Sequence, residues 1–171
     1  MIDHRLVAEL AKALREEPLR DSFADEEDFE RRFVEPLCRE VLTRLAPTVH
    51  LAVHPWGDQT KAPAWRESKR WGAVRVWGMA HSFDLVAIDP ASRKSLAVEV
   101  KLARISGGRL PTGEFQRMAG QCLLARLKHE AVIGVFGYHG QLPERWPEET
   151  KAAERVLADR YGIWLIIRKA G

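Results

Sequence analysis

The sequence predicts a mixed α/β fold in which helices cover both faces of one sheet. Apolar residues recur at helical spacing in four stretches, and shorter apolar or alternating runs typical of strands separate them. The order is also informative: two helical stretches precede three closely spaced strands, and helices and strands then alternate. Strands joined by short turns are antiparallel, whereas strands joined through a helix are parallel, so we expect a sheet of mixed direction.

The N-terminal part is predicted to contain two helices. Residues 3–16 carry a stripe of leucines, and Pro18 lies just beyond them. Residues 25–45 form a longer helix that opens with four consecutive acids, which stabilise the positive end of the helix dipole. Pro36 lies inside this run, so we expect it to kink the helix or to split it in two.

The remaining elements follow in a regular order. Strands are predicted at 49–53, about 73–78, 82–89, 95–103, 131–138 and 162–168, and helices at 112–128 and 147–161. The strands at 73–78, 82–89 and 95–103 are expected to form an antiparallel meander, with Gly78 near its first bend. The strands at 95–103 and 131–138, with the helix between them, are expected to form a right-handed parallel crossover.

Composition favours one soluble globular domain spanning 1–171. Hydrophobic residues make up 46% and charged residues 30%, and no apolar run approaches the roughly 18 residues of a membrane span. The N-terminal stretch is amphipathic and charged, unlike a signal peptide. Cys38 and Cys122 fall in separate predicted helices and indicate buried thiols in a reducing, cytoplasmic protein, with one disulfide as the alternative.

The net charge of +3 hides an asymmetry. Residues 16–30 hold eight of the 24 acids and one base, Arg20, which leaves 26 bases against 16 acids elsewhere. Arginine outnumbers lysine 19 to 8, and its planar fork suits phosphate oxygens. The pattern is expected for a nucleic-acid-binding protein. An arginine-rich solvated surface that reflects biased genome composition is the alternative.

One predicted strand carries an acid and a lysine two residues apart, Glu99 and Lys101. Because side chains alternate along a strand, these two share one face. The opposite face is apolar and consists of Leu96, Val98 and Val100.

The register of the hairpin brings a second acid to this face. A four-residue turn at 90–93 sets Asp89 opposite Lys94, and counting back sets Asp84 opposite Glu99. A slip of two residues would leave the same acids and lysine together. Two close carboxylates repel each other unless a cation lies between them, and a hard divalent ion such as Mg²⁺ meets that need.

These residues resemble the motif of the PD-(D/E)xK nuclease superfamily. Asp84 corresponds to the family's first acid, and Glu99-Val100-Lys101 corresponds to its (D/E)xK triplet. Phe83 stands where the name-giving motif has proline, a departure that is frequent in the family. The resemblance implies a restriction-endonuclease-like αβββαβ core at 25–138. Residues 1–24 would then be an N-terminal helical extension, and residues 139–171 a C-terminal helix and strand.

The resemblance also implies metal-dependent hydrolysis of phosphodiester bonds that leaves a 5′-phosphate. Asp84, Glu99 and the backbone carbonyl of Val100 would hold Mg²⁺ or Mn²⁺, and Lys101 would orient water or offset developing charge. DNA is the expected substrate, and a homodimer is left open because many relatives dimerise. The alternatives are a nuclease-fold protein that binds nucleic acid or a protein partner without cutting, and a plain surface ion pair.

Two further residues are catalytic candidates by resemblance. Many members place a glutamate from the first core helix near the metal, and Glu30 lies on the inward side of that predicted helix; an ordinary first-turn acid is the alternative. Recombinase-B-like relatives carry a glutamine on the helix after the triplet, with a tyrosine four residues later. Gln121 matches the glutamine, but Ala125 stands in the tyrosine position. Gln116 is the weaker candidate, and both glutamines could instead be surface residues.

Nucleic-acid contacts are expected from basic residues and tryptophans. Arg104 and Arg109 belong to the loop that leaves the strand beside the proposed metal. Four tryptophans within 22 residues are interleaved with five basic residues: Trp56, Lys61, Trp65, Arg66, Lys69, Arg70, Trp71, Arg75 and Trp77. Of these, Lys69 and Arg70 are candidate phosphate contacts. Exposed tryptophans stack on unpaired bases, although large aromatics are more often buried, and Trp77 is expected in the core because it belongs to a strand.

Overall fold

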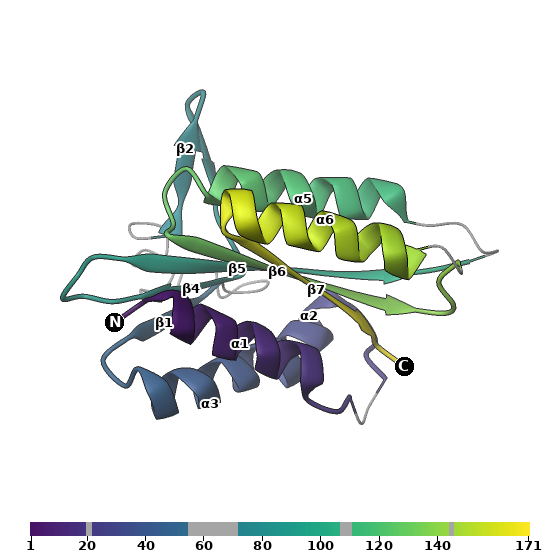
Figure 1. The fold of residues 1–171 in the computed structure, drawn as a ribbon, viewed down its shortest axis with the longest axis horizontal. Helices are drawn as coiled ribbons and strands as arrows, with labels where there is room; N and C mark the ends of the chain where they lie inside the picture. The colour runs from purple at the N-terminus through teal and green to yellow at the C-terminus, as the bar shows by residue number, and fades with distance from the viewer. Residues whose placement is uncertain (20–21, 55–71, 107–110, 144–145) are drawn as a thin grey trace.

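The computed structural model describes residues 1–19, 22–54, 72–106, 111–143 and 146–171. It is a three-layer α/β structure in which α1 and α3 cover one face of a five-stranded sheet and α5 and α6 cover the other (Figure 1). The helices are α1 His4–Glu16, α2 Glu26–Phe29, the π-helical η1 Glu30–Val34, α3 Glu35–Leu45, α5 Thr112–Ala125 and α6 Trp146–Tyr161. The predicted mixed α/β class is therefore confirmed.

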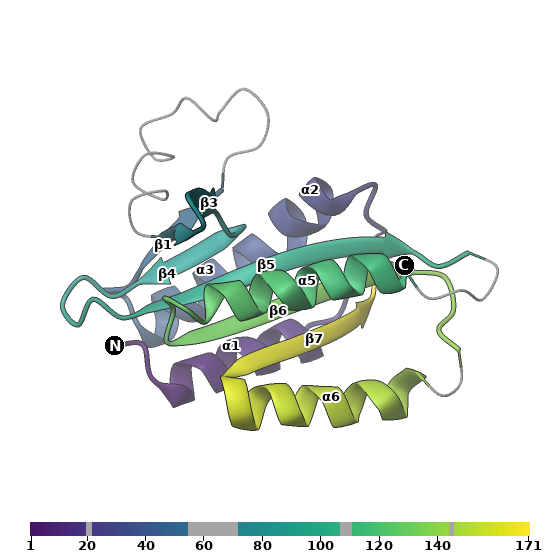
Figure 2. The same cartoon turned by 90° about the horizontal axis from the view of Figure 1, so that it is seen from above.

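The central sheet has the order β1-β4-β5-β6-β7 (Figure 2). Its strands are β1 His50–Val53, β4 Leu85–Ile88, β5 Ser95–Arg104, β6 Ala131–His139 and β7 Ile163–Lys169. β4 runs antiparallel to both of its neighbours, whereas β5, β6 and β7 are parallel. The predicted parallel pairing of β5 with β6 across the intervening helix is confirmed.

The predicted three-strand meander is wrong in its first strand. Residues 73–78 do not join the sheet, because β2 Val74–Val76 pairs only with β3 Met79–His81 in a separate hairpin. β1 occupies the place beside β4 instead. The predicted strand at 82–89 is also shorter than expected, since β4 begins at Leu85. β4 is almost wholly buried, so a strand that covers its far edge is favoured over an exposed hairpin.

The long helix predicted at 25–45 consists of α2, η1 and α3 in direct succession, whereas Pro36 was expected to kink it or to split it in two. The Glu35 amide donates to the carbonyl oxygen of Glu30, a π-helical spacing, immediately before Pro36 in the first turn of α3. Proline has no amide hydrogen and its ring crowds the preceding turn, so regular α-helical bonding is interrupted here. The wider turn directs Glu30, Phe33 and Val34 into the interior, where all three are buried.

Two apolar clusters hold the layers together, one on each face of the sheet. The α1–α3 side includes Leu6, Leu10, Leu14, Val34, Val41, Leu96, Val98, Val100, Ile133 and Val135. The α5–α6 side includes Phe83, Val86, Ala97, Met118, Cys122, Val132, Phe136 and Leu165. The predicted apolar face of β5 therefore packs against α1 and α3. Since α1 contacts α3 and β7, the N-terminal segment contributes to the main core.

His129 is one of the polar side chains that are buried. His129 is buried between Ser95 and Gly72, with Nδ1 2.8 Å from the Ser95 hydroxyl and Nε2 3.0 Å from the Gly72 carbonyl. A carbonyl only accepts, so Nε2 carries the hydrogen and Nδ1 accepts from Ser95.

Cys38 and Cys122 are buried on opposite faces of the sheet as free thiols, so the disulfide alternative is wrong. Among the described residues, no helix is both long enough and apolar enough to cross a membrane.

Candidate active site

The hairpin of β4 and β5 has the predicted register. Leu85 pairs with Val98, and the Asp89 amide donates to the Lys94 carbonyl at 2.9 Å. This register sets Asp84, one residue before β4, across from Glu99, so the alternative slip of two residues is wrong. The Asp84 carbonyl accepts the His54 amide at 2.6 Å, which ties this residue to the end of β1.

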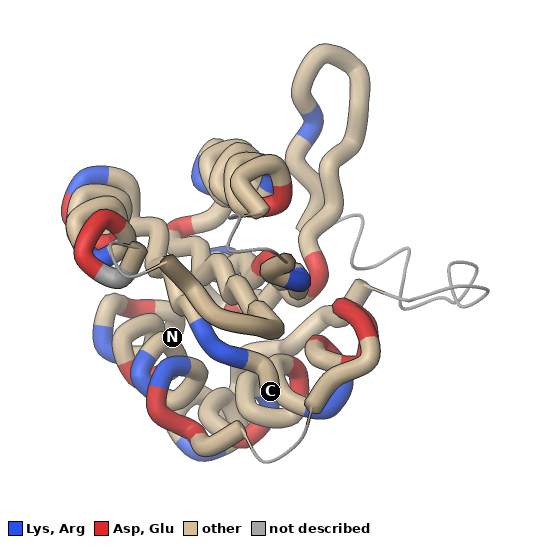
Figure 3. The backbone as a smooth tube through the Cα atoms, turned by 90° about the vertical axis from the view of Figure 1, so that its right-hand side faces the viewer, with Lys and Arg blue, Asp and Glu red and all other residues tan. Residues whose placement is uncertain are grey.

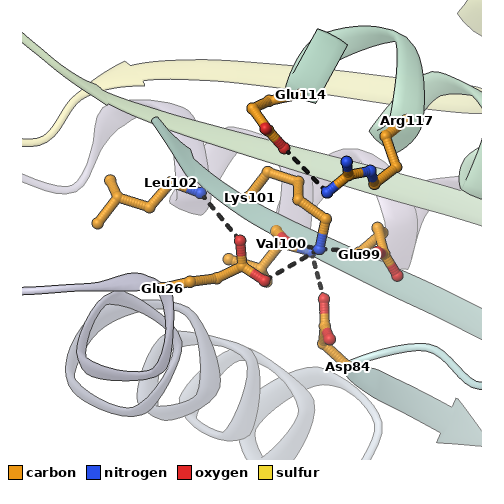
Figure 4. A network of polar contacts seen from close by, with 8 residues as sticks. All are labelled: Glu26, Asp84, Glu99, Val100, Lys101, Leu102, Glu114 and Arg117. Carbon is orange, nitrogen blue, oxygen red and sulfur yellow. Dashed lines mark hydrogen bonds and ion pairs between the residues drawn. The ribbon is translucent and has the colours of Figure 1, made fainter. Parts of the chain in front are cut away.

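Asp84 lies where β5 loses its antiparallel neighbour. β4 pairs with β5 only as far as Val98. The next amide of β5 that points toward the same edge, on Val100, donates to Asp84 Oδ2 at 2.6 Å (Figure 4). The carboxylate thus takes the hydrogen bond that a strand carbonyl would otherwise accept. Among the described residues, no strand pairs with this edge of β5 beyond Val98, and a fixed acid lies there, adjacent to the acid–x–lysine triplet.

Lys101 connects this edge to the N-terminal helices. Its Nζ lies 3.0 Å from Glu26 Oε1, 3.1 Å from Glu99 Oε1 and 2.8 Å from the Val100 carbonyl oxygen (Figure 4). The lysine side chain is 12% exposed and that of Glu99 only 1%. The contact between Lys101 and Glu99 is an ion pair without hydrogen-bond geometry, since both Glu99 oxygens are buried and have no hydrogen-bond partner among the described residues.

This arrangement leaves negative charge poorly compensated. Burial, and then the charge of Asp84, raise the pKa of Glu99 to about 8. Burial also raises the pKa of Asp84 to about 6, against the lowering effects of Lys101 and the Val100 amide. Burial alone would lower the pKa of Lys101, but Glu99, Asp84 and Glu26 together raise it above its ordinary value. Lys101 is therefore charged at neutral pH, and the carboxyl groups of Glu99, Asp84 and Glu26 surround it.

The donor chemistry fits a hard divalent cation with few protein ligands. Within the described ranges, no three His, Cys, Asp or Glu side chains are arranged as a complete metal-binding group. Mg²⁺ does not require one, because it typically binds one or two carboxylates and keeps several waters. Asp84, Glu99 and the Val100 carbonyl are the available oxygens. A cation there would relieve the repulsion that raises the pKa of Glu99.

Glu26 is the acid that the sequence interpretation missed. The first core helix was expected to contribute Glu30, but the carboxylate that contacts Lys101 comes from Glu26, one turn earlier. Its second oxygen lies 3.4 Å from the Leu102 amide. Glu30 is fully buried, which confirms its predicted inward direction. The spacing of four residues between the two glutamates was the available signal, since it places both on one helix face.

The two glutamines on α5 differ in exposure. Gln116 is exposed, as expected of a surface residue. Gln121 is half-buried, and its Oε1 is covered without a hydrogen-bond partner in the part of the chain that the structure describes. Its neighbour Cys122 lies close enough to the acids for Glu99 and Asp84 to add to the effect of burial, which raises the pKa of the thiol. This part of α5 therefore lies over the acid cluster.

The predicted nucleic-acid contacts are only partly described. Arg104 is exposed at the end of β5, and its Nη2 lies 3.4 Å from the Ala24 carbonyl oxygen. It lines an open pocket of about 730 Å³ together with Arg32 and His139. The other candidates, Lys69, Arg70 and Arg109, lie outside the described residues, as do Trp56, Trp65 and Trp71.

Trp77 corrects another prediction. It was expected in the core, but its side chain is 93% exposed at the turn between β2 and β3. The reason is local: Gly78 and Trp77 both have positive φ, so the chain reverses at these two residues, and the strand pattern ends before Trp77.

Comparison of the chain with protein-family models, with curated proteins and with solved structures found no match. The function of the site is therefore inferred from its own residues, and above all from the buried Glu99, the adjacent Asp84 and the charged Lys101.

Proposed function

We propose that this protein is a Mg²⁺-dependent nuclease of the restriction-endonuclease-like type, and that it hydrolyses phosphodiester bonds in DNA. The observation that carries the proposal is the buried Glu99 carboxyl group, which lies 3.1 Å from Lys101 Nζ and across from Asp84, where burial raises its pKa. Strongly shifted pKa values next to a charge partner are typical of functional sites, because folding alone gains little from them.

Asp84 and Glu99, with the Val100 carbonyl, would hold the metal ion. When bound, Mg²⁺ polarises the phosphate and lowers the pKa of a coordinated water. The protein would fix the direction of its ligands: the Val100 amide holds one oxygen of Asp84 at 2.6 Å, which leaves the other oxygen for the ion. Glu99 is held by its burial in the sheet.

Lys101 would stabilise negative charge that develops on the phosphate, or orient the attacking water. Its ammonium group is already held by the Val100 carbonyl and Glu26, so it requires little reorganisation. Glu26 acts on the substrate only through Lys101 and is a positioning residue. Arg104, exposed three residues further along β5, would contact the nucleic-acid backbone. The two free thiols fit a reducing, cytoplasmic location.

The second candidate is a protein of the same fold that binds nucleic acid without cutting it. One observation favours it: Lys101 already contacts both Glu99 and the Val100 carbonyl, two of the three proposed ligands. Such a protein would keep a salt-sensitive affinity for DNA, but cleavage would be absent with every divalent metal.

Cleavage of supercoiled plasmid, single-stranded DNA and RNA, each with Mg²⁺, Mn²⁺ or EDTA, separates these candidates. The variants are Asp84→Asn, which keeps an oxygen acceptor for the Val100 amide, and Lys101→Ala. Lys151→Ala, an exposed lysine on α6, is the matched control. We expect metal-dependent cutting by wild type and control that both site variants lose. Salt-sensitive binding without cutting would establish the second candidate, and cutting that survives in both site variants would contradict the assigned site.

A further inference from the structure

The β2–β3 hairpin presents a tryptophan to solvent at its tip. The hairpin stands away from the sheet on the side covered by α5 (Figures 1 and 3). Trp77 is 93% exposed, more than any other large hydrophobic residue that the structure describes, and Met79 beside it is 60% exposed. Isolated exposed apolar residues are ordinary, but a large aromatic at the end of a projecting hairpin indicates an interaction.

The turn gives no structural reason for a tryptophan. Trp77 and Gly78 are its two central residues, with φ of 50° and 80°. Turns of this kind favour asparagine, aspartate and glycine, because a bulky side chain is strained at positive φ. An exposed residue in a strained backbone conformation gains nothing from packing, and such positions are concentrated at functional sites.

The base of the hairpin is anchored to the residues that follow α5, and the chain leads from the end of β3 to Asp84 in three residues. Lys128 Nζ donates to the Ala73 carbonyl at 3.0 Å, and His129 Nε2 donates to the Gly72 carbonyl. Trp77 precedes Asp84 by seven residues, so the tip lies within about 24 Å of that acid at ~3.4 Å per extended residue. A nucleic-acid strand crossing the site can therefore reach the hairpin within a few nucleotides.

The chemistry of the hairpin suits a polyanion with accessible bases. Residues 73–83 contain Arg75, which is exposed, and His81, but no acid. A protein partner is less well matched, because a tryptophan buries roughly 150–250 Å² whereas a stable interface buries about 800 Å² on each side. Bases within a duplex are already stacked on their neighbours, so an exposed ring gains most from an unpaired base.

We propose that Trp77 is a stacking site for an unpaired nucleobase, and that the substrate contains single-stranded or branched nucleic acid. This inference rests on the proposed nuclease function and deepens it by naming a substrate class. Arg75 contacts the phosphate backbone beside the stacked base, and the strand continues from the hairpin toward the Asp84–Glu99–Lys101 cluster.

The test is fluorescence anisotropy in EDTA with a short single-stranded DNA oligonucleotide and the same sequence as a duplex. Trp77→Ala is compared with wild type, with Trp77→Phe, which retains an aromatic ring, and with Tyr161→Ala, an exposed aromatic at the end of α6. We expect Trp77→Ala to bind the single strand about 5- to 150-fold more weakly, because one base–aromatic stack is lost. Trp77→Phe and Tyr161→Ala should stay near wild type, and duplex affinity should change little.

Each other outcome overturns the proposal, and cleavage with Mn²⁺ on the same preparations shows which one has failed. If wild type cuts DNA but Trp77→Ala binds the single strand as wild type does, the stacking site is wrong while the nuclease remains. If Trp77→Ala loses the same affinity for the single strand and for the duplex, the site does not select unpaired bases. A wild-type dimer that Trp77→Ala dissociates, with unchanged DNA affinity, makes the hairpin a protein interface. Wild type that neither binds nor cuts any nucleic acid refutes both proposals.

Discussion

Replacing Glu99 by glutamine is expected to stabilise the metal-free protein, although Glu99 Oε1 lies 3.1 Å from the Lys101 ammonium group. The side chain is buried, and burial and the charge of Asp84 raise its pKa from the ordinary 4.5 to about 8. At pH 7 the carboxyl group is ionised in the unfolded chain but keeps its proton in the folded protein. The interval from 4.5 to 7 corresponds to about 3 kcal/mol of lost stability at ~1.4 kcal/mol per pH unit.

The direction of the pH dependence follows from the raised pKa. Because the folded protein holds the proton more tightly than the unfolded chain, wild type loses stability as pH rises from about 4.5 to about 8. Glu99→Gln lacks this titration, so its advantage should be small near pH 4.5 and largest at pH 8 and above. The pKa of about 8 already reflects the attraction of Lys101, so the expected gain at pH 7 stays about 3 kcal/mol.

Urea denaturation in EDTA between pH 5 and pH 9 measures this difference. Glu114→Gln, which removes a 43% exposed acid on α5, should stay within about 0.5 kcal/mol of wild type. Added Mn²⁺ should stabilise wild type but not Glu99→Gln, because binding to the folded state alone shifts the equilibrium. Destabilisation of Glu99→Gln throughout this pH range would show that the contact with Lys101 outweighs the burial of the acid, and would contradict the raised pKa of Glu99.

Three other predictions test the fold and the substrate contacts. Burial lowers the pKa of His129 from 6.5 to about 4, so the free energy of unfolding should fall by up to about 3 kcal/mol as pH drops through this interval. Urea denaturation should show a smaller fall for His129→Gln. An unchanged dependence of stability on pH in this variant would speak against the buried neutral imidazole. Gly137→Ala places a methyl group 2.8 Å from the Phe29 ring and should destabilise the protein by about 1–3 kcal/mol. Gly120→Ala, on α5, places a methyl group that meets nothing within 4 Å and should stabilise the protein by about 0.5–1 kcal/mol. Thermal denaturation that ranked the two variants the other way would contradict the packing. Arg104→Ala should weaken DNA binding and reduce the salt dependence by about one phosphate contact, and an unaltered salt slope would exclude that contact.

The hairpin with the acids could be predicted because its determinants are local. The short turn after Asp89 fixes the register, and the alternation of apolar and charged residues fixes the faces of β5. These two facts predicted Asp84 across from Glu99, with a slip of two residues as the alternative. The split at Pro36 was equally local, since a missing amide hydrogen acts on its own helical turn.

Contacts between distant segments could not be obtained in this way. Glu26 and Lys101 are 75 residues apart, and no spacing rule chooses Glu26 over Glu30 as the acid that contacts the lysine. The pairing of β1 with β4 depends on which strand best covers a buried edge. The turn at Trp77 went unrecognised because a tryptophan before glycine is an uncommon choice for two residues of positive φ.

The most direct test of the proposed active site is the rate of DNA cleavage as a function of Mn²⁺ concentration, for wild type and Glu99→Gln on the same single-stranded substrate. We expect a rate that rises and saturates with metal for wild type, and no metal-dependent cleavage by Glu99→Gln, although this variant should be folded and more stable without metal. Equal rates with the same metal dependence would show that Glu99 holds no catalytic ion and would contradict the proposed site.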